Sequence, residues 1–113
     1  MIISDKAEAM QQYLTMANMF ANAQRNNDFV NGNEPATAIA YLGKLLREDV
    51  EGQQLLASHL NHDDPYVRVW IAGDCLFFKP DVAIPVLEAI EKTGGLLGTS
   101  ARMTLSEWRA GRL

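Results

Sequence analysis

The hydrophobic positions near the start of this chain recur at helical spacing, which predicts a long first helix over about residues 4–25. Asp5 or Ser4 suits the N-cap position, and Glu8 favours the first turn. The polar clusters 26–28 and 31–33 tolerate turn conformations, and this region is expected to form the longest loop. The inward stripe of this helix is Met10, Tyr13, Leu14, Ala17, Phe20 and Ala21.

Two further helices are predicted before residue 61. The second is expected to begin near Asn33 or Glu34, with Pro35 in its first turn, and to end near Asp49. The third spans about residues 50–60, and Gly52 weakens its start by up to about 1 kcal/mol relative to alanine. The inward residues are Ala38, Tyr41, Leu42, Leu45 and Leu46 in the second helix, and Leu55, Leu56 and Leu60 in the third.

The clearest helix start in the chain is Asp64-Pro65. Asp64 is a good N-cap, and Pro65 occupies the first helical position, where its fixed φ is already helical. This fourth helix is expected to reach about Phe78 and is apolar on nearly every side, so it should be central. The residues on its inward face are Val67, Trp70, Ile71, Cys75 and Phe78.

Two more helices complete the predicted chain. Asp81 is expected to cap the fifth, over about residues 82–92, with Pro85 one turn inside. Residues 94–98 should form a glycine-rich loop from which Leu96 and Leu97 tuck back onto the core. Thr99 or Ser100 then caps a sixth helix with Ala101, Leu105 and Trp108 inward, and Gly111 suits the left-handed position after its end.

These patterns predict an all-α protein of about six helices stacked as antiparallel pairs in one domain, residues 1–113. No segment outside the proline-capped fourth helix alternates like a strand. Hydrophobic residues make up 48% of the chain and charged residues 21%, which is ordinary for a globular protein.

Charge is uneven along the chain. Residues 1–64 carry a net charge of −5 and residues 65–113 a net charge of +1, which gives −4 overall. Clustered Lys and Arg, which general nucleic-acid binding needs, are missing. An acidic surface would suit a basic protein partner, although an ordinary solvated face is an equally good explanation.

The sequence favours a cytoplasmic monomer. No apolar run is long enough to span a bilayer, and the start of the chain lacks a secretion signal. The single cysteine, Cys75, has no partner for an internal disulfide and is expected to be a small buried residue. No coiled-coil heptad points to an oligomer.

Two segments carry a resemblance to a known family. Asp64-Pro65-Tyr66-Val67-Arg68 and Ala83-Ile84-Pro85-Val86-Leu87 resemble the most recognisable parts of HEAT repeats, in the right order, over about residues 55–113. The run 98–111 resembles small bacterial HEAT-like domains, some of which look like immunity proteins that neutralise toxins exchanged between cells. The resemblance implies a stack whose concave side is lined by the second helix of each pair.

A helical stack of this kind places function in its surface side chains. The candidate partner-binding residues are Glu48, Asp49, Glu51, Asp63, Tyr66, Arg102 and Arg109. In HEAT-like stacks the arginine at the position of Arg68 commonly pairs with turn aspartates, here Asp63 or Asp64, so the resemblance implies a structural role for Arg68.

Catalytic and metal-binding alternatives are weaker. His59, His62, Asp63 and Asp64 are candidate metal ligands, but His62 lies past the predicted helix end and the aspartates serve as cap and turn residues. No phosphate-binding loop or nucleophile arrangement is present in the sequence. We therefore expect neither an enzyme nor a bound cofactor.

Two functional hypotheses follow. The first is an immunity protein that binds a basic nuclease toxin and covers its active site or substrate channel, with no contact to nucleic acid or membrane. The alternative is a HEAT-like adaptor that bridges protein partners without inhibiting one.

Overall fold

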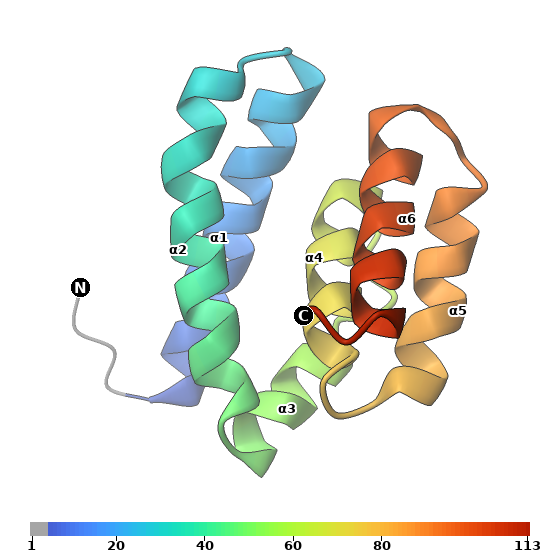
Figure 1. Cartoon of the computed structure of the whole chain (residues 1–113). Coiled ribbons are helices and arrows are strands. Elements are labelled where there is room, and N and C mark those ends of the chain that lie inside the picture. The colour runs from blue at the N-terminus through green and yellow to red at the C-terminus, as the bar shows by residue number, and fades with distance from the viewer. Residues whose placement is uncertain (1–4) are drawn as a thin grey trace.

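Six α-helices form the part of the chain that the computed structural model describes, residues 5–113, with Phe29 described by its backbone alone (Figure 1). They are α1 Lys6–Arg25, α2 Phe29–Arg47, α3 Val50–Ala57, α4 Pro65–Cys75, α5 Pro80–Glu91 and α6 Gly95–Arg109. No strand occurs within residues 5–113, so the prediction of an all-α protein with about six helices is confirmed.

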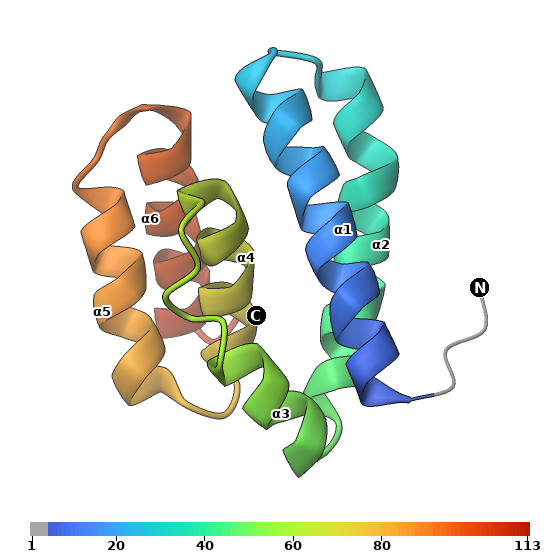
Figure 2. The same cartoon turned by 180° about the vertical axis from the view of Figure 1, so that it is seen from behind.

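The helices pack as pairs around α4. α1 and α2 form the most extensive pair, α5 and α6 the next, and α4 contacts all five other helices, as its apolar character predicted. The short helix α3 lies across one end, and the chain then runs back to the start of α4 (Figure 2). As a result, α2, α4 and α6 all run in the same direction (Figure 1).

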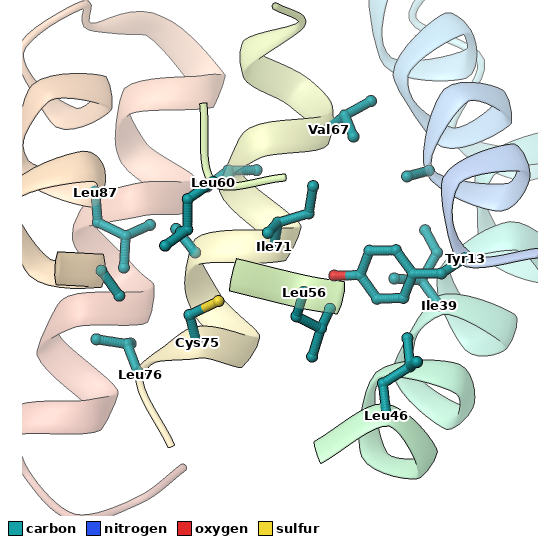
Figure 3. Packing of buried hydrophobic residues seen from close by; sticks show 14 of the residues in the cluster. Tyr13, Ile39, Leu46, Leu56, Leu60, Val67, Ile71, Cys75, Leu76 and Leu87 are labelled. Atoms are coloured by element: carbon teal, nitrogen blue, oxygen red, sulfur yellow. The ribbon is translucent and has the colours of Figure 1, made fainter. Parts of the chain in front are cut away.

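One hydrophobic core continues through all six helices. Figure 3 shows Tyr13, Ile39 and Leu46 from the α1–α2 pair facing Leu56 of α3, with Ile71 of α4 close by. The predicted inward stripes are largely confirmed, but Tyr41 is 63% exposed. The inward face of α2 instead consists of Ile39, Leu42 and Leu46.

The junction of α1 and α2 differs from the prediction. Asp5 caps α1 by accepting a hydrogen bond from the Glu8 backbone N–H at 2.7 Å, whereas Ser4, the alternative cap, lies outside the described residues. α2 begins at Phe29, so the connection is residues 26–28 and Pro35 lies inside the helix. Asp28 caps this early start by accepting a hydrogen bond from the Asn31 backbone N–H at 3.3 Å, and the buried Gly32 lies against Phe20 of α1.

Asp49 caps α3 by accepting a hydrogen bond from the Gly52 backbone N–H at 2.9 Å. The helix ends at Ala57, one turn earlier than predicted, although Leu60 remains buried in the following turns. A Cβ on Gly52 would collide with the backbone carbonyl of Leu46. The glycine therefore weakens the helix locally but permits the tight α2–α3 turn.

Asp64 and Pro65 start α4 as predicted, and the Asp64 carboxylate accepts a hydrogen bond from the Tyr66 backbone N–H at 3.0 Å. α4 ends at Cys75, and turn residues continue to Phe78. α5 starts at Pro80 rather than after Asp81, and its N-cap residue Lys79 makes no side-chain capping bond.

The start of α6 was predicted wrongly. α6 begins at Gly95, so Gly98 lies within the helix and neither Thr99 nor Ser100 caps it. Gly94, with φ of 73°, makes the turn, and the place for a Cβ on Gly98 lies only 2.8 Å from the Glu91 carbonyl oxygen. This close approach to α5 holds the extra turn in place. Gly111, with φ of 73°, has the left-handed conformation predicted for it.

Cys75 is fully buried, as predicted, and burial raises the pKa of its thiol to about 12. None of the helices in the described part of the chain is both long and apolar enough to cross a membrane.

Two glycine substitutions test the packing of the turn. Gly52→Ala should lower the free energy of unfolding by about 1–3 kcal/mol, because the new methyl group has no space beside the Leu46 carbonyl. Gly73→Ala is the matched control, since its Cβ would make an ordinary 3.6 Å contact with Thr104 and should stabilise the helix by up to about 1 kcal/mol. Urea denaturation of both variants measures the difference, and equal effects would contradict this explanation.

Candidate functional site

A groove of about 730 Å³ runs along α4 between α2 and α6. In the described structure α2 and α6 each contact α4 but do not contact each other, which leaves the space open. The floor is one face of α4, consisting of Tyr66, Val69, Trp70, Gly73 and Asp74. One wall is a face of α6 that includes Leu96, Leu97, Ser100, Met103 and Glu107, and Ala40 and Arg47 of α2 lie opposite.

Large apolar side chains in the groove remain uncovered. Leu96 is 62% exposed, Met103 59% and Phe77 49%. Trp70, predicted to face the core, is only partly buried, and its ring meets Phe20 of α1 edge-on with 5.4 Å between the ring centroids. Exposed apolar side chains gathered in one place are typical of a binding surface.

Asp74 forms a polar junction at one end of the groove. The Tyr13 hydroxyl of α1 donates a hydrogen bond to Asp74 Oδ2 at 2.7 Å, and Arg47 Nε of α2 lies 3.5 Å from Asp74 Oδ1. The place for a Cβ on Gly43 is only 2.5–2.9 Å from the atoms of this carboxylate. Asp74 therefore joins α1, α2 and α4, and only glycine lets α2 approach so closely.

Burial dominates the electrostatics of this junction. It raises the pKa of Asp74 to about 6, although the Tyr13 hydrogen bond and the Arg47 charge both act to lower that pKa. Burial and the nearby carboxylate also raise the pKa of Tyr13 well above its ordinary value. The Arg47 guanidinium stacks 3.7 Å above the Phe77 ring, and its buried Nε has no hydrogen-bond partner among the described residues.

A carboxyl group with a raised pKa in a groove has the properties of a general base. Here both oxygens already face protein groups, because Oδ2 accepts from Tyr13 and Oδ1 faces Arg47. We interpret Asp74 as a junction that holds the α1–α2 pair against α4.

A second charged contact lies near the Tyr66 end of the groove. Arg25 of α1 donates two hydrogen bonds to the Asp64 carboxylate, at 2.6 and 2.9 Å, and stacks 4.6 Å above the Tyr66 ring. The Arg25 bonds lower the pKa of Asp64. The predicted pairing of Arg68 with Asp63 or Asp64 is replaced by a 2.7 Å bond from Arg68 to the His62 carbonyl oxygen, so Arg68 holds the loop before α4.

The predicted acidic residues lie outside the groove. Glu48, Asp49 and Glu51 are exposed at the α2–α3 turn, immediately after Arg47. Lys6 Nζ lies 4.0 Å from Glu48 and 3.6 Å from Asp49, so one lysine faces two of these carboxylates. Asp63 is exposed in the loop before α4.

The other predicted binding residues are divided. Tyr66 lines the groove, whereas Arg102 and Arg109 are exposed on α6 and do not line it. Arg109 lies 3.4 Å from Glu88 of α5 in an exposed ion pair, which contributes little to stability.

Sequence reasoning missed the groove residues Arg47, Asp74 and Met103. One signal was present, because α4 has more apolar positions than a single core face needs. The exposed Leu96 and Met103 lie on α6 beside its buried face, a second signal of the same kind. That Arg47 and Asp74 meet cannot be inferred from spacing, since they lie on different helix pairs.

The candidate metal ligands have other partners. His59 Nδ1 lies 2.9 Å from the Leu55 carbonyl oxygen, and His62 Nδ1 accepts a bond from the Asp64 backbone N–H at 3.0 Å. Over residues 5–113, no group of three or more His, Cys, Asp or Glu side chains is placed to hold a metal ion.

Comparison with known proteins identifies no relative, since no family model, no curated protein and no solved structure matches this chain. The functional interpretation therefore depends on the groove and on the charges around it.

The raised pKa of Asp74 predicts a pH-dependent stability. The native state binds a proton at Asp74 up to pH about 6, whereas an unfolded aspartate loses it near pH 3.9, so stability falls as pH rises through this window. Asp74→Asn removes this titration. The variant should therefore gain about 2 kcal/mol relative to the wild type between pH 4.5 and pH 7.5.

Urea unfolding of both proteins at these two pH values measures the gain. Comparing the variants at each pH cancels the opposite contribution of Asp64, whose lowered pKa loses stability on acidification. A difference between the two proteins that stays constant with pH would show that the pKa of Asp74 is not raised.

Proposed function

We propose that this chain is a non-catalytic, HEAT-like protein-binding domain that captures a segment of a partner protein in the groove over α4. The observation that carries the proposal is the open groove of about 730 Å³, in which the large apolar side chains of Phe77, Leu96 and Met103 are about half exposed or more. Such a surface gains free energy when a partner covers it.

The composition of the groove supports a protein partner. Tyr66, Trp70 and Phe77 provide aromatic contacts, and Met103 provides an adaptable one. Polar side chains surround them, including Gln24, Thr99 and Ser100. An apolar centre with a polar rim is the usual arrangement of a protein interface.

The architecture agrees with the HEAT-like interpretation. Second helices of successive pairs should line the concave side of such a stack. In the HEAT-like interpretation α2, α4 and α6 would be these second helices, and all three contribute to the groove. The end of α1 also contributes, through Phe20 and Gln24.

We further propose that the partner is a basic toxin domain, a nuclease, which the chain neutralises by covering its active site or substrate channel. The exposed acidic residues Glu48, Asp49 and Glu51 follow directly after Arg47 at the groove, and would attract a basic partner to this edge. The groove would then anchor the partner after encounter. An adaptor that captures a segment without inhibiting its owner would use the same groove.

Co-expression separates these two functions. The chain should restore growth to cells that express the toxin encoded next to its gene, and Met103→Glu should abolish this rescue. Met19→Glu is the matched control, because Met19 is 50% exposed on α1 and does not line the groove. Since Met103→Glu adds negative charge, a loss of rescue would reflect the apolar contact rather than attraction to a basic toxin.

If neither the wild type nor Met19→Glu restores growth although both are well expressed, the immunity function is rejected and the adaptor function remains. Rescue that Met103→Glu leaves intact would show that the toxin is bound elsewhere.

Charge reversal tests the acidic edge. Glu48→Lys with Glu51→Lys should slow association with the toxin about tenfold and reduce its salt dependence, because the electrostatic attraction is lost. Asp49 is left in place, since it caps α3. The control pair Glu34→Lys with Glu91→Lys changes the net charge by the same amount, near the start of α2 and at the end of α5. Stopped-flow measurements should show a smaller effect of this pair on the association rate. Equal effects of the two pairs would contradict local steering.

A further inference from the structure

The spacing of its lining residues and its length suit the groove to a short helix. The lining positions on α4 are Tyr66, Val69, Trp70, Gly73 and Asp74, a spacing that follows a single helix face. The wall on α6 runs from Leu96 to Glu107, eleven residue steps or roughly 16 Å of helix. The groove between α2 and α6 is therefore about three helical turns long along α6.

The chemistry of the groove favours a helical occupant over an extended one. Apart from Phe77 and Leu113, its lining residues lie on helices, whose backbone groups beyond the first and last turns are bonded within each helix, and most of its lining side chains are apolar. An extended segment would bury its own N–H and C=O groups there without partners, at a high cost. An amphipathic helix satisfies its backbone internally and fills such a groove with side chains at i, i+3, i+4 and i+7.

Arg47 adds a polar requirement at one end. Its guanidinium has five N–H donors, yet it stacks on Phe77 and reaches Asp74 only at 3.5 Å from Nε. No hydrogen bond from this guanidinium is present among the described residues. A partner that covers the groove excludes water from these donors and must supply acceptors for them.

We propose that the segment bound in the groove is a single amphipathic helix of the partner protein, with an apolar face on Trp70 and Met103 and an acidic side chain that binds Arg47. The proposal rests on the proposed function and specifies the chemistry of the segment captured. A carboxylate matches the planar fork of the guanidinium.

Asp74 makes the proposed contact between Arg47 and the acidic side chain of the partner helix depend on pH. The groups that face the Asp74 carboxylate are Tyr13 from α1, Arg47 from α2 and the neighbouring Cys75 of α4. Tyr13 and Cys75 titrate far above neutrality. A second carboxylate on Arg47 would favour the neutral form of Asp74, so binding of the acidic helix would take up a proton between pH 5.5 and 7.5.

Synthetic helices of about 15 residues provide the probe. Each peptide has leucines along one face. The three peptides differ only in the residue at the two ends of this face, which is Glu in the first, Gln in the second and Leu in the third. Because both ends carry the same residue, the comparison does not depend on the direction in which the helix binds. By fluorescence anisotropy, the wild type should bind the Glu peptide about tenfold more tightly than the Gln or Leu peptide. Arg47→Met should remove this preference, and Arg47→Lys should retain part of it.

Two further comparisons locate the binding. Met103→Lys should abolish binding of all three peptides, and Met19→Lys should not, although both add a charge that attracts the Glu peptide. The wild type should bind the Glu peptide several-fold more tightly at pH 5.5 than at pH 7.5, and Asp74→Asn should remove this pH dependence.

Equal affinity of the wild type for the three peptides would overturn the acidic contact, as would a preference that survives in Arg47→Met. Failure of all three peptides to bind would overturn the proposal of a helical occupant. Tighter binding of the fatty acid dodecanoate than of the Glu peptide would also overturn it. In each of these cases, toxin rescue that depends on Met103 would leave the proposed function standing. The proposed function fails separately if Met103→Glu has no effect on rescue.

Discussion

The contact on which the rest of this structure depends is the Asp74 carboxylate, which is only 15% exposed where three helices meet. Tyr13 of α1 donates to it at 2.7 Å, Arg47 of α2 faces it, and Gly43 leaves the space that it occupies. These groups hold the α1–α2 pair against α4 at one end, while Arg25 and Asp64 join α1 to α4 at the other. The separation of α2 from α6, and with it the groove, follows from these two junctions.

The Asp74 junction destabilises the native state as well as orienting it. Because burial raises the pKa of Asp74 to about 6, ionising this carboxylate at neutral pH costs free energy in the native state. An apolar side chain in its place would make the native state more stable. A polar junction can nevertheless specify one packing arrangement, because its hydrogen bonds require particular partners. In this protein the arrangement leaves Trp70 of α4 partly exposed at the groove, next to the exposed Phe77. The Asp74 junction and the proposed binding surface thus share the same helix.

Local signals predicted the features that depend on neighbouring residues. Asp5 and Asp64 cap their helices as expected, since each cap bonds a backbone N–H two or three residues along the chain. Predictions failed at two helix starts. α2 starts before Pro35, where Asp28 accepts a hydrogen bond from the Asn31 backbone N–H, and α6 starts before Gly98, which lets this helix approach α5 closely. Close contact depends on an element elsewhere in the chain, which periodicity cannot show.

The sequence by itself determined the helical class, the order of the helices and the central place of α4, because periodicity, caps and prolines act over a few residues. Only the tertiary structure decided which charged groups meet. Tyr13 and Asp74 lie 61 positions apart, and Arg25 and Asp64 lie 39 apart. The groove also belongs to the tertiary structure, since it exists where two helices on either side of α4 fail to touch. Whether an apolar side chain packs in the core or faces a groove depends on the packing angle of its helix, and no property of the residue alone sets that angle.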